Sequence, residues 1–235
     1  RFENMLAESG KIAARISPGC EACVLSTRAE HLMDQDRYAE AVDMKLHALA
    51  MAADRGLLKE AQRRLDWHAD HMGYLIDMGR LDKALELAVV VASLLDEKEI
   101  ESDVRLRAMF ATLRLASARG ELETEQPVLK VRETAASTGQ LAFVVRCDLE
   151  LARCRRAGGR HDDAVSAATS AAEGARRLGD RLLEVETLVE LALARRAAGY
   201  EQSAREAGAE ATALADRLGS ERWARLAAEA VDGHQ

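Results

Sequence analysis

A short segment that precedes or opens a helix recurs along the chain at a nearly constant spacing. Its copies read "DRYAEAV" at Asp36, "GRLDKAL" at Gly79, "GELETEQ" at Gly120, "GRHDDAV" at Gly159 and "GYEQSAR" at Gly199. Successive copies are 43, 41, 39 and 40 residues apart. Self-similarity at such a period is typical of a solenoid, in which one structural unit is repeated and packs on its neighbours. We therefore expect a repeat architecture.

Each unit is predicted to contain two helices. Apolar residues make up 48% of the chain, aromatic residues only 3%, and Pro18 and Pro127 are its only prolines. Such a composition favours helices that pack through small side chains, and no segment alternates long enough to predict a strand. The expected first helices span 20–34, 57–78, 101–118, 141–157 and 181–197. The expected second helices span 37–55, 81–97, 125–137, 161–178 and 201–218, with a helix at 2–15 before them and a capping helix at 221–231.

Glycines and small residues mark the turns and the close contacts of these helices. Glycine follows the first helices at 79, 120, 159 and 199, and the second helices at 56, 139, 179 and 219. The residue after a helix often adopts a left-handed conformation, which glycine favours. Alanine recurs at three positions where helices should approach closely, as Ala29, Ala152 and Ala192, as Ala41, Ala84, Ala164 and Ala204, and as Ala48, Ala171 and Ala211. At the first of these positions, two units carry Met72 and Leu113 instead.

With its turn glycine and spaced alanines, the segment "YLIDMGRLDKA", from Tyr74 to Ala84, resembles the tetratricopeptide repeat family. The resemblance covers about residues 20–231. It implies an all-α, right-handed superhelix of about five helix pairs plus a capping helix, forming a single repeat domain over 1–235 with repeats at about 20–55, 57–97, 101–137, 141–178 and 181–218. The units are longer than the family's common length of about 34 residues. In this they are similar to the helical repeats of bacterial signal-transduction regulators that carry an ATPase.

The third unit departs from the repeat. Glu125 stands where alanine is expected, and Pro127 follows two residues later. Proline is tolerated only in the first turn of a helix, because it lacks a backbone N–H and clashes with the preceding turn. The second helix of this unit is therefore expected to start late.

The triplet His161-Asp162-Asp163 looks like a set of metal ligands. Its histidine, however, occupies the repeat position of Leu81, and its carboxylates fall in a first helical turn, where negative charge is favourable. We therefore interpret the triplet as a corner-closing side chain followed by two N-terminal carboxylates.

Cys20 and Cys23 form a Cys-x-x-Cys pair near a predicted helix start, which could be a redox site or half of a zinc site with His68 and His71. In the next repeat, the two histidines lie five residues beyond the positions that match the two cysteines. This is about 7.5 Å along the helix axis, too far for all four side chains to bind one ion easily. We favour a structural role for the pair, and we interpret Cys147 and Cys154 as small apolar residues of one helix face.

The resemblance implies that the first helices line a concave groove that binds extended peptides. Carried onto this chain, the groove positions are acidic in the first two units and rich in arginine in the next three. The predicted groove residues are Arg107, Phe110, Arg114, Arg146, Leu149, Arg153, Arg156, Leu193 and Arg196. Arginine suits the recognition of carboxylates, so an acidic peptide is the expected ligand. A solvated arginine face without a ligand is the alternative.

The remaining signals exclude several classes of function. The net charge of −7 argues against nucleic-acid binding, no apolar run is long enough to span a membrane, and no phosphate-binding loop or catalytic motif is present. The first residue is not methionine, which suggests a piece of a longer polypeptide. We predict a cytoplasmic, non-enzymatic scaffold without cofactor or metal that binds a protein or peptide and could form oligomers. The alternatives are a sensor segment of a larger ATPase-type transcriptional regulator and, less favoured, a metal- or redox-dependent protein using Cys20 and Cys23.

Overall fold

The computed structural model describes residues 18–35, 37–54, 56–97, 99–121 and 125–232, together with Met5, Glu8 and Ile12, and gives the backbone alone at 18–20, 34 and 232. Within these ranges every regular element is a helix, and the all-α prediction is confirmed. The expected helix at 2–15 lies largely outside the described residues.

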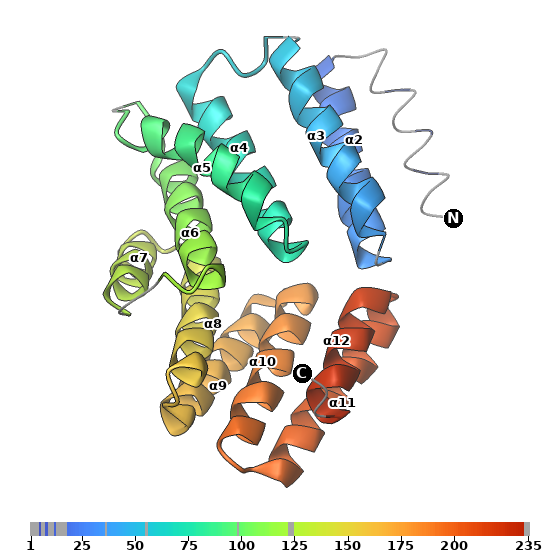
Figure 1. Cartoon of the computed structure of the whole chain (residues 1–235), viewed down its shortest axis with the longest axis vertical. Coiled ribbons are helices and arrows are strands. Elements are labelled where there is room, and N and C mark those ends of the chain that lie inside the picture. Colours follow the sequence, from blue (N-terminus) through green and yellow to red (C-terminus); the bar gives the residue numbers. More distant parts are fainter. Residues whose placement is uncertain are drawn as a thin grey trace. The chain divides into compact units, whose positions relative to one another are not determined.

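The helices follow one another as first and second members of successive repeats (Figure 1). The first helices are α2 (Pro18–Asp34), α4 (Ala61–Asp77), α6 (Ser102–Ala118), α8 (Leu141–Ala157) and α10 (Arg181–Ala197). The second helices are α3 (Tyr38–Asp54), α5 (Leu81–Leu95), α7 (Gln126–Ser137), α9 (His161–Leu178) and α11 (Glu201–Leu218), and α12 (Glu221–Asp232) follows them. The largest difference from expectation is at α4, which starts at Ala61 instead of residue 57 because residues 56–58 form a turn.

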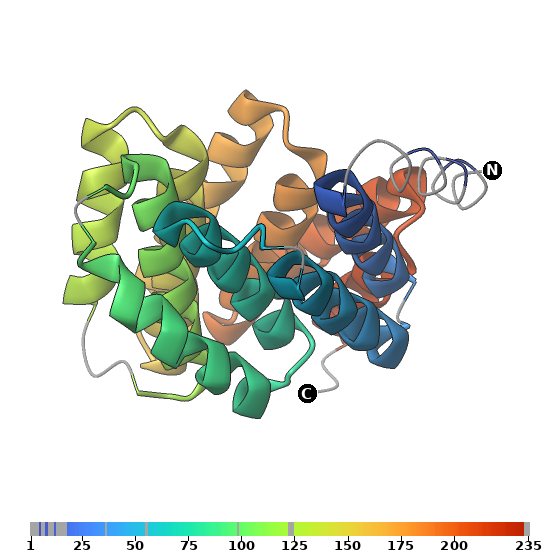
Figure 2. The same ribbon diagram turned by 90° about the horizontal axis from the view of Figure 1, so that it is seen from above.

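The chain divides into two compact units, residues 1–115 and 116–235. In unit 1, α2 packs along α3 and α4 packs along α5, as Figures 1 and 2 show from two sides. Side chains of α4, α5 and α6 share one core cluster, which includes Leu65, Met72, Val91, Val104 and Ala108.

In unit 2, α9 packs against both α8 and α10, and α10 also contacts α11 and α12. A cluster of buried residues from α8, α9 and α10 holds three of these helices together: Val145, Leu149, Ala171, Ala175 and Leu183. Each unit thus has its own apolar core.

The turns use glycine as the repeat predicts. All eight turn glycines have positive φ, and α4 shows the resulting geometry. Gly79, at φ +70°, lets the chain reverse so that its N–H donates to the carbonyl of Ile76 and the next N–H, of Arg80, donates to that of Leu75. These bonds satisfy carbonyls that the helix end would otherwise leave unpaired.

The small residues lie where the repeat places them. All the alanines predicted to lie at close helix contacts are buried, with at most 3% of their surface exposed: Ala29, Ala41, Ala48, Ala84, Ala152, Ala164, Ala171, Ala192, Ala204 and Ala211. Met72 and Leu113, which replace alanine in two units, are buried as well. Helix contact through small side chains is therefore a property of both units.

The late start of the third unit's second helix is confirmed. Helix α7 begins at Gln126, six residues after Gly120, with Pro127 in its first turn. Glu125, which precedes it, accepts hydrogen bonds from Arg155 on α8 and from Arg160 just before α9. The glutamate that breaks the repeat therefore ties the start of α7 to the next repeat.

Candidate partner-binding faces of the first helices

Two arginines of α8, Arg153 and Arg156, are held by carboxylates of their own helix and of α10. Arg153 Nη1 donates to Glu150 at 2.6 Å, and its Nη2 donates to Glu186 at 2.8 Å. Arg156 Nε donates to Glu190 at 2.7 Å, and Arg153 Nε lies 3.8 Å from the same carboxylate. Glu150 and Glu190 have side chains only 4% exposed. We call these five residues the unit-2 ion-pair cluster. Burial lowers the pKa of Arg153, but its three carboxylates outweigh burial and raise the pKa well above its usual range.

The other predicted groove residues of unit 2 differ in their surroundings. Arg146 is half-buried on α8 and, among the described residues, has no hydrogen-bond or ion-pair partner for its side chain. Arg196 Nη1 donates to the backbone carbonyl of Val231 on α12 at 3.2 Å. Leu193 is half-buried, whereas Leu149 belongs to the apolar core and is 2% exposed. Leu149 therefore offers almost no surface to a partner.

The arginines of α6 in unit 1 are paired in the same manner, with acids of α4. Arg107 Nη1 donates to Asp66 and Arg114 Nη2 donates to Asp77, each at 2.5 Å. Phe110, between the two arginines in sequence, is buried. Like Leu149, it has little surface for contact with a ligand.

A polar pocket of about 260 Å³ opens between three first helices of unit 1. Its lining residues are Cys23, Ser26 and Thr27 of α2, Asp66, Trp67 and Asp70 of α4, and Arg107 of α6. Burial raises the pKa of Asp66 above its ordinary value. The positive charge of Arg107 opposes this rise, and the negative charges of Asp70 and Asp103 add to it. The predicted site residue Arg107 thus shares one pocket with Cys23, Ser26 and Asp66 of the two preceding first helices.

A buried lysine lies beside this pocket, on α3, the second helix of the first repeat. Lys45 of α3 is 2% exposed, and its Nζ donates to Ser26 at 2.5 Å, to Glu30 at 3.2 Å and to Asp70 at 3.3 Å. The same ammonium lies 3.6 Å from the centre of the Tyr74 ring. Lys45 therefore joins α2 to α4 through residues that also line the pocket.

His71 lies next to Lys45 and is 1% exposed. Its Nδ1 is 2.8 Å from the carbonyl oxygen of Trp67, and its Nε2 is 2.9 Å from that of Lys45. A neutral imidazole carries one N–H and can donate to only one of these oxygens. Burial and the Lys45 charge lower the pKa of His71, while Asp70 and the two carbonyls raise it less. The buried ring is therefore neutral at pH 7.

Acidification should destabilise unit 1 through His71. The folded pKa lies below the ordinary 6.5, so when pH falls through 6.5 the unfolded chain takes up the proton first. The stability present above pH 6.5 is lost as pH falls, by at most about 1.4 kcal/mol between about pH 7.5 and 5.5, the limit for a ring that stays neutral over this range. Urea unfolding at several pH values measures this loss. His71→Gln should reduce it, whereas His47→Gln, at an exposed position of α3, should not; an equal pH dependence in both variants would contradict the assignment.

Three of the residues considered for a zinc site, Cys23, His68 and His71, lie in different surroundings. Cys23 is exposed and lines the polar pocket, whereas His68 lines a separate cavity and His71 is buried against backbone carbonyls. The side chain of Cys20 lies outside the described residues. Cys147 is buried, and burial raises the pKa of its thiol to about 12, so it is protonated at neutral pH.

The triplet at 161–163 lies as the structural interpretation requires. His161 is the first residue of α9, and Asp162 and Asp163 occupy its first turn. Asp162 accepts a hydrogen bond from the Tyr200 hydroxyl at 2.8 Å, which links the starts of α9 and α11. Within the described residues, no group of three or more histidine, cysteine or acidic side chains is arranged to hold a metal ion.

Sequence reasoning located the arginines but missed several of their neighbours. Lys45 stands in a repeat position that holds Ala88, Ala168 and Gly208 in other units, so a lysine there was a detectable exception. The pairing of Asp66 with Arg107 could also have been found, because these opposite charges occupy the same position in adjacent repeats. Glu150 and Glu190 gave no such signal.

The geometry of both units defines a tetratricopeptide-like helical-repeat protein. No protein-family model and no curated protein matches the sequence. A Rap protein solved in complex with competence and sporulation factor is similar in structure, with a TM-score of 0.77, 13% identity, and coverage of 94% of this chain and 61% of that one. Aspartyl phosphate phosphatase F from Bacillus subtilis is similar with a TM-score of 0.63, 14% identity, and coverage of 98% and 60%.

These identities show the fold alone. The chain spans about three fifths of the length of each of the two solved proteins. Among the described residues, no helix is both long and apolar enough to cross a bilayer.

Proposed function

We propose that this protein is a non-enzymatic scaffold that binds an extended, acidic segment of a peptide or protein partner on the first-helix face of unit 2. The observation that carries the proposal is the state of Arg146. It is half-buried and unpaired among the described residues, whereas Arg153 and Arg156 on the same helix are fixed by carboxylates. An acidic side chain or terminal carboxylate would supply the missing partner of Arg146.

The ion-pair cluster gives the other arginines a supporting role. Arg153 and Arg156 already have carboxylate partners, so an acidic ligand would have to compete with Glu186 and Glu190 for them. On α10, Arg196 and the half-buried Leu193 belong to the same proposed binding surface. We therefore assign the specificity for negative charge to Arg146, and the rigidity of the surface to the cluster.

The solved neighbours support a binding role. One of them was crystallised with competence and sporulation factor, so a fold of this kind can hold a partner. The arrangement of helices into repeats also presents extended surfaces that suit peptides. Phe110 and Leu149, being buried, are left out of the proposed contact surface.

A selection experiment tests the proposal. A phage-displayed library of random linear peptides is selected against the immobilised whole chain, and the enriched peptides are synthesised and measured by isothermal titration calorimetry. We expect enriched peptides to contain aspartate, glutamate or a free terminal carboxylate. Arg146→Glu should weaken their binding by about tenfold or more, since a charge-assisted bond contributes roughly 1.5 to 3 kcal/mol.

The matched control is Arg177→Glu, a charge reversal at an exposed position of α9, a second helix. It changes the net charge by the same amount and should leave affinity unchanged. Selected peptides without acidic groups, or equal affinities of the two variants, would refute the proposed acidic ligand.

A second candidate function is a sensor segment of a larger ATPase-type transcriptional regulator, located in the cytoplasm. What favours it is the helix length, since the helix pairs of unit 2 contain helices of 17 and 18 residues, matching the long repeats of that class. An ATPase or helix-turn-helix module in the parent gene product would support this candidate, and its absence from a complete parent sequence would remove it.

A further inference from the structure

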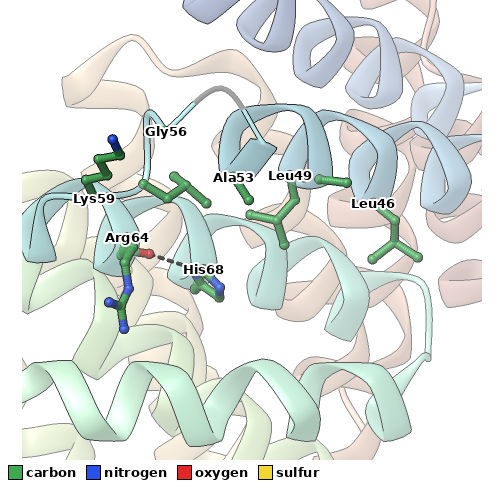
Figure 3. A pocket seen from close by; sticks show the side chains of 9 residues that line it. Leu46, Leu49, Ala53, Gly56, Lys59, Arg64 and His68 are labelled. Atoms are coloured by element: carbon green, nitrogen blue, oxygen red, sulfur yellow. Dashed lines mark hydrogen bonds between the residues drawn. The ribbon is translucent and has the colours of Figure 1, made fainter.

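A cavity of about 490 Å³ lies in unit 1, away from the polar pocket (Figure 3). Helix α3 contributes leucine and alanine side chains to it, and α4 contributes Arg64 and His68. Its lining residues are Leu46, Leu49, Ala50, Ala53, Gly56, Leu58, Lys59, Arg64 and His68. The volume falls within the range of roughly 300 to 1,000 Å³ that small-molecule sites occupy.

One side of this cavity is apolar. Leu49 and Leu58 belong to a core cluster with Ala52, so they form a fixed surface. Leu46, on the same helix, is 37% exposed although it is a large apolar residue. An aliphatic chain lying along α3 would remove this leucine surface from water, which is favourable.

The charged residues that line the cavity, Lys59 and Arg64, are both basic. Lys59 precedes α4 and Arg64 lies in its first turn, and among the described residues neither side chain has an ion-pair partner. The neighbouring Arg63, which does not line the cavity, pairs with Glu60. None of the lining residues is acidic, although the whole chain carries a net charge of −7.

The turn at Gly56 positions one of these cations. Gly56 has a φ of +69°, and a side chain added there would meet Lys59 Cε at 2.8 Å. The lysine stem therefore lies over the glycine, at the end of the cavity where α3 ends and α4 begins. Figure 3 shows the Lys59 and Arg64 side chains extending in opposite directions from the start of α4.

His68 adds a hydrogen-bond acceptor. Its Nδ1 donates to the carbonyl of Arg64 at 2.7 Å, as Figure 3 shows, so in the neutral ring Nε2 carries the lone pair. Burial is the main cause that lowers the pKa of His68, which favours this neutral form. A hydroxyl or amide N–H on a ligand could donate to Nε2.

From this geometry we propose that the cavity binds a small amphipathic carboxylate, whose aliphatic chain lies on the α3 leucines and whose carboxylate pairs with one of the two lining cations, Arg64 or Lys59. Charge complementarity and the lack of acidic lining residues select an anion over a neutral or cationic amphiphile. The site is independent of the first-helix face proposed above to bind peptides.

Decanoate serves as the probe, titrated into the whole chain by isothermal titration calorimetry, with decanol and decylamine as head-group controls. We expect decanoate to bind at about one equivalent and the two controls to bind at least about tenfold more weakly. 3-Hydroxydecanoate should bind a few-fold more tightly than decanoate, because its hydroxyl can donate to His68. Equal binding of decylamine and decanoate would overturn the proposal.

Two kinds of variant locate the site. Arg64→Gln combined with Lys59→Gln should weaken decanoate binding at least tenfold, whereas Arg63→Gln, one residue away and outside the cavity, should leave it unchanged. Ala53→Phe, at an exposed alanine of the lining, should abolish binding by filling the cavity while circular dichroism shows an intact fold. Unchanged binding in either cavity variant, or tighter binding of a leucine-terminated peptide than of decanoate, would rule out the assignment. Arg146→Glu should have no effect on decanoate, which separates this site from the peptide face.

Discussion

Replacing Arg153 by glutamate is expected to lower the free energy of unfolding of unit 2 by about 3 to 5 kcal/mol. Arg153 lies among Glu150, Glu186 and Glu190, and the substitution would add a fourth carboxylate to this group, leaving Arg156 as the remaining cation of the cluster. Glu150 and Glu190 are almost fully buried, so water cannot solvate them adequately. Thermal and urea unfolding of the whole chain would measure the loss.

Arg146→Glu is the matched control, because Arg146 lies two turns earlier on the same helix and has no ion pair among the described residues. Its cost should stay below about 1 kcal/mol, as is usual for a charge outside such a network. Equal losses in the two variants would show that the cluster does not stabilise the fold. The large expected loss also means that a charge reversal at Arg153 cannot serve as a clean test of binding.

His71→Ala is the second substitution with a large expected effect, a loss of about 3 kcal/mol in unit 1. The ring is 1% exposed and stacks on Trp67 with 5.5 Å between ring centroids. Removing it would leave a cavity beside Trp67 and Lys45, at the contact between α3 and α4, and would also delete the one hydrogen bond that the neutral ring donates, to the carbonyl of Trp67 or of Lys45.

A matched substitution separates packing from hydrogen bonding. His71→Leu restores most of the buried apolar volume and matches Leu151 and Leu191, which hold the same position in other repeats. It should recover about half of the loss, because only the polar contact is then missing. Calorimetric unfolding checks the order wild type, His71→Leu, His71→Ala; a leucine variant as unstable as the alanine variant would mean that the hydrogen bond alone accounts for the effect.

Much of the fold could be predicted from the sequence because it depends on local rules. Turn glycines at a fixed period and alanines at helix contacts are properties of each repeat by itself, and both were found where expected. The start of α4 was misplaced because the pattern does not reveal that Leu58 is buried within a turn.

The candidate site was predictable only in part, because its chemistry depends on contacts between repeats. Periodicity places Arg107 and Arg153 on a helix face, but it does not show that Asp66 and Glu186 lie within hydrogen-bond distance of them. The same limit applies to the cavity beside α3, whose lining comes from residues of unremarkable type. These leucine, alanine and lysine residues form a candidate binding site only because α3 and α4 leave a cavity between them.

The direction of the ion pairs bears on how such a chain can evolve. Among the ion pairs between first helices, the arginines of unit 1 belong to the later repeat and the acids to the earlier one, whereas in unit 2 this order is reversed. An array that grows by duplication starts with interchangeable members, and any of them can be copied, moved or lost. Here, exchanging two repeats would set arginine against arginine or acid against acid. The repeats of this chain are therefore not interchangeable, because each ion pair fits one order of neighbours.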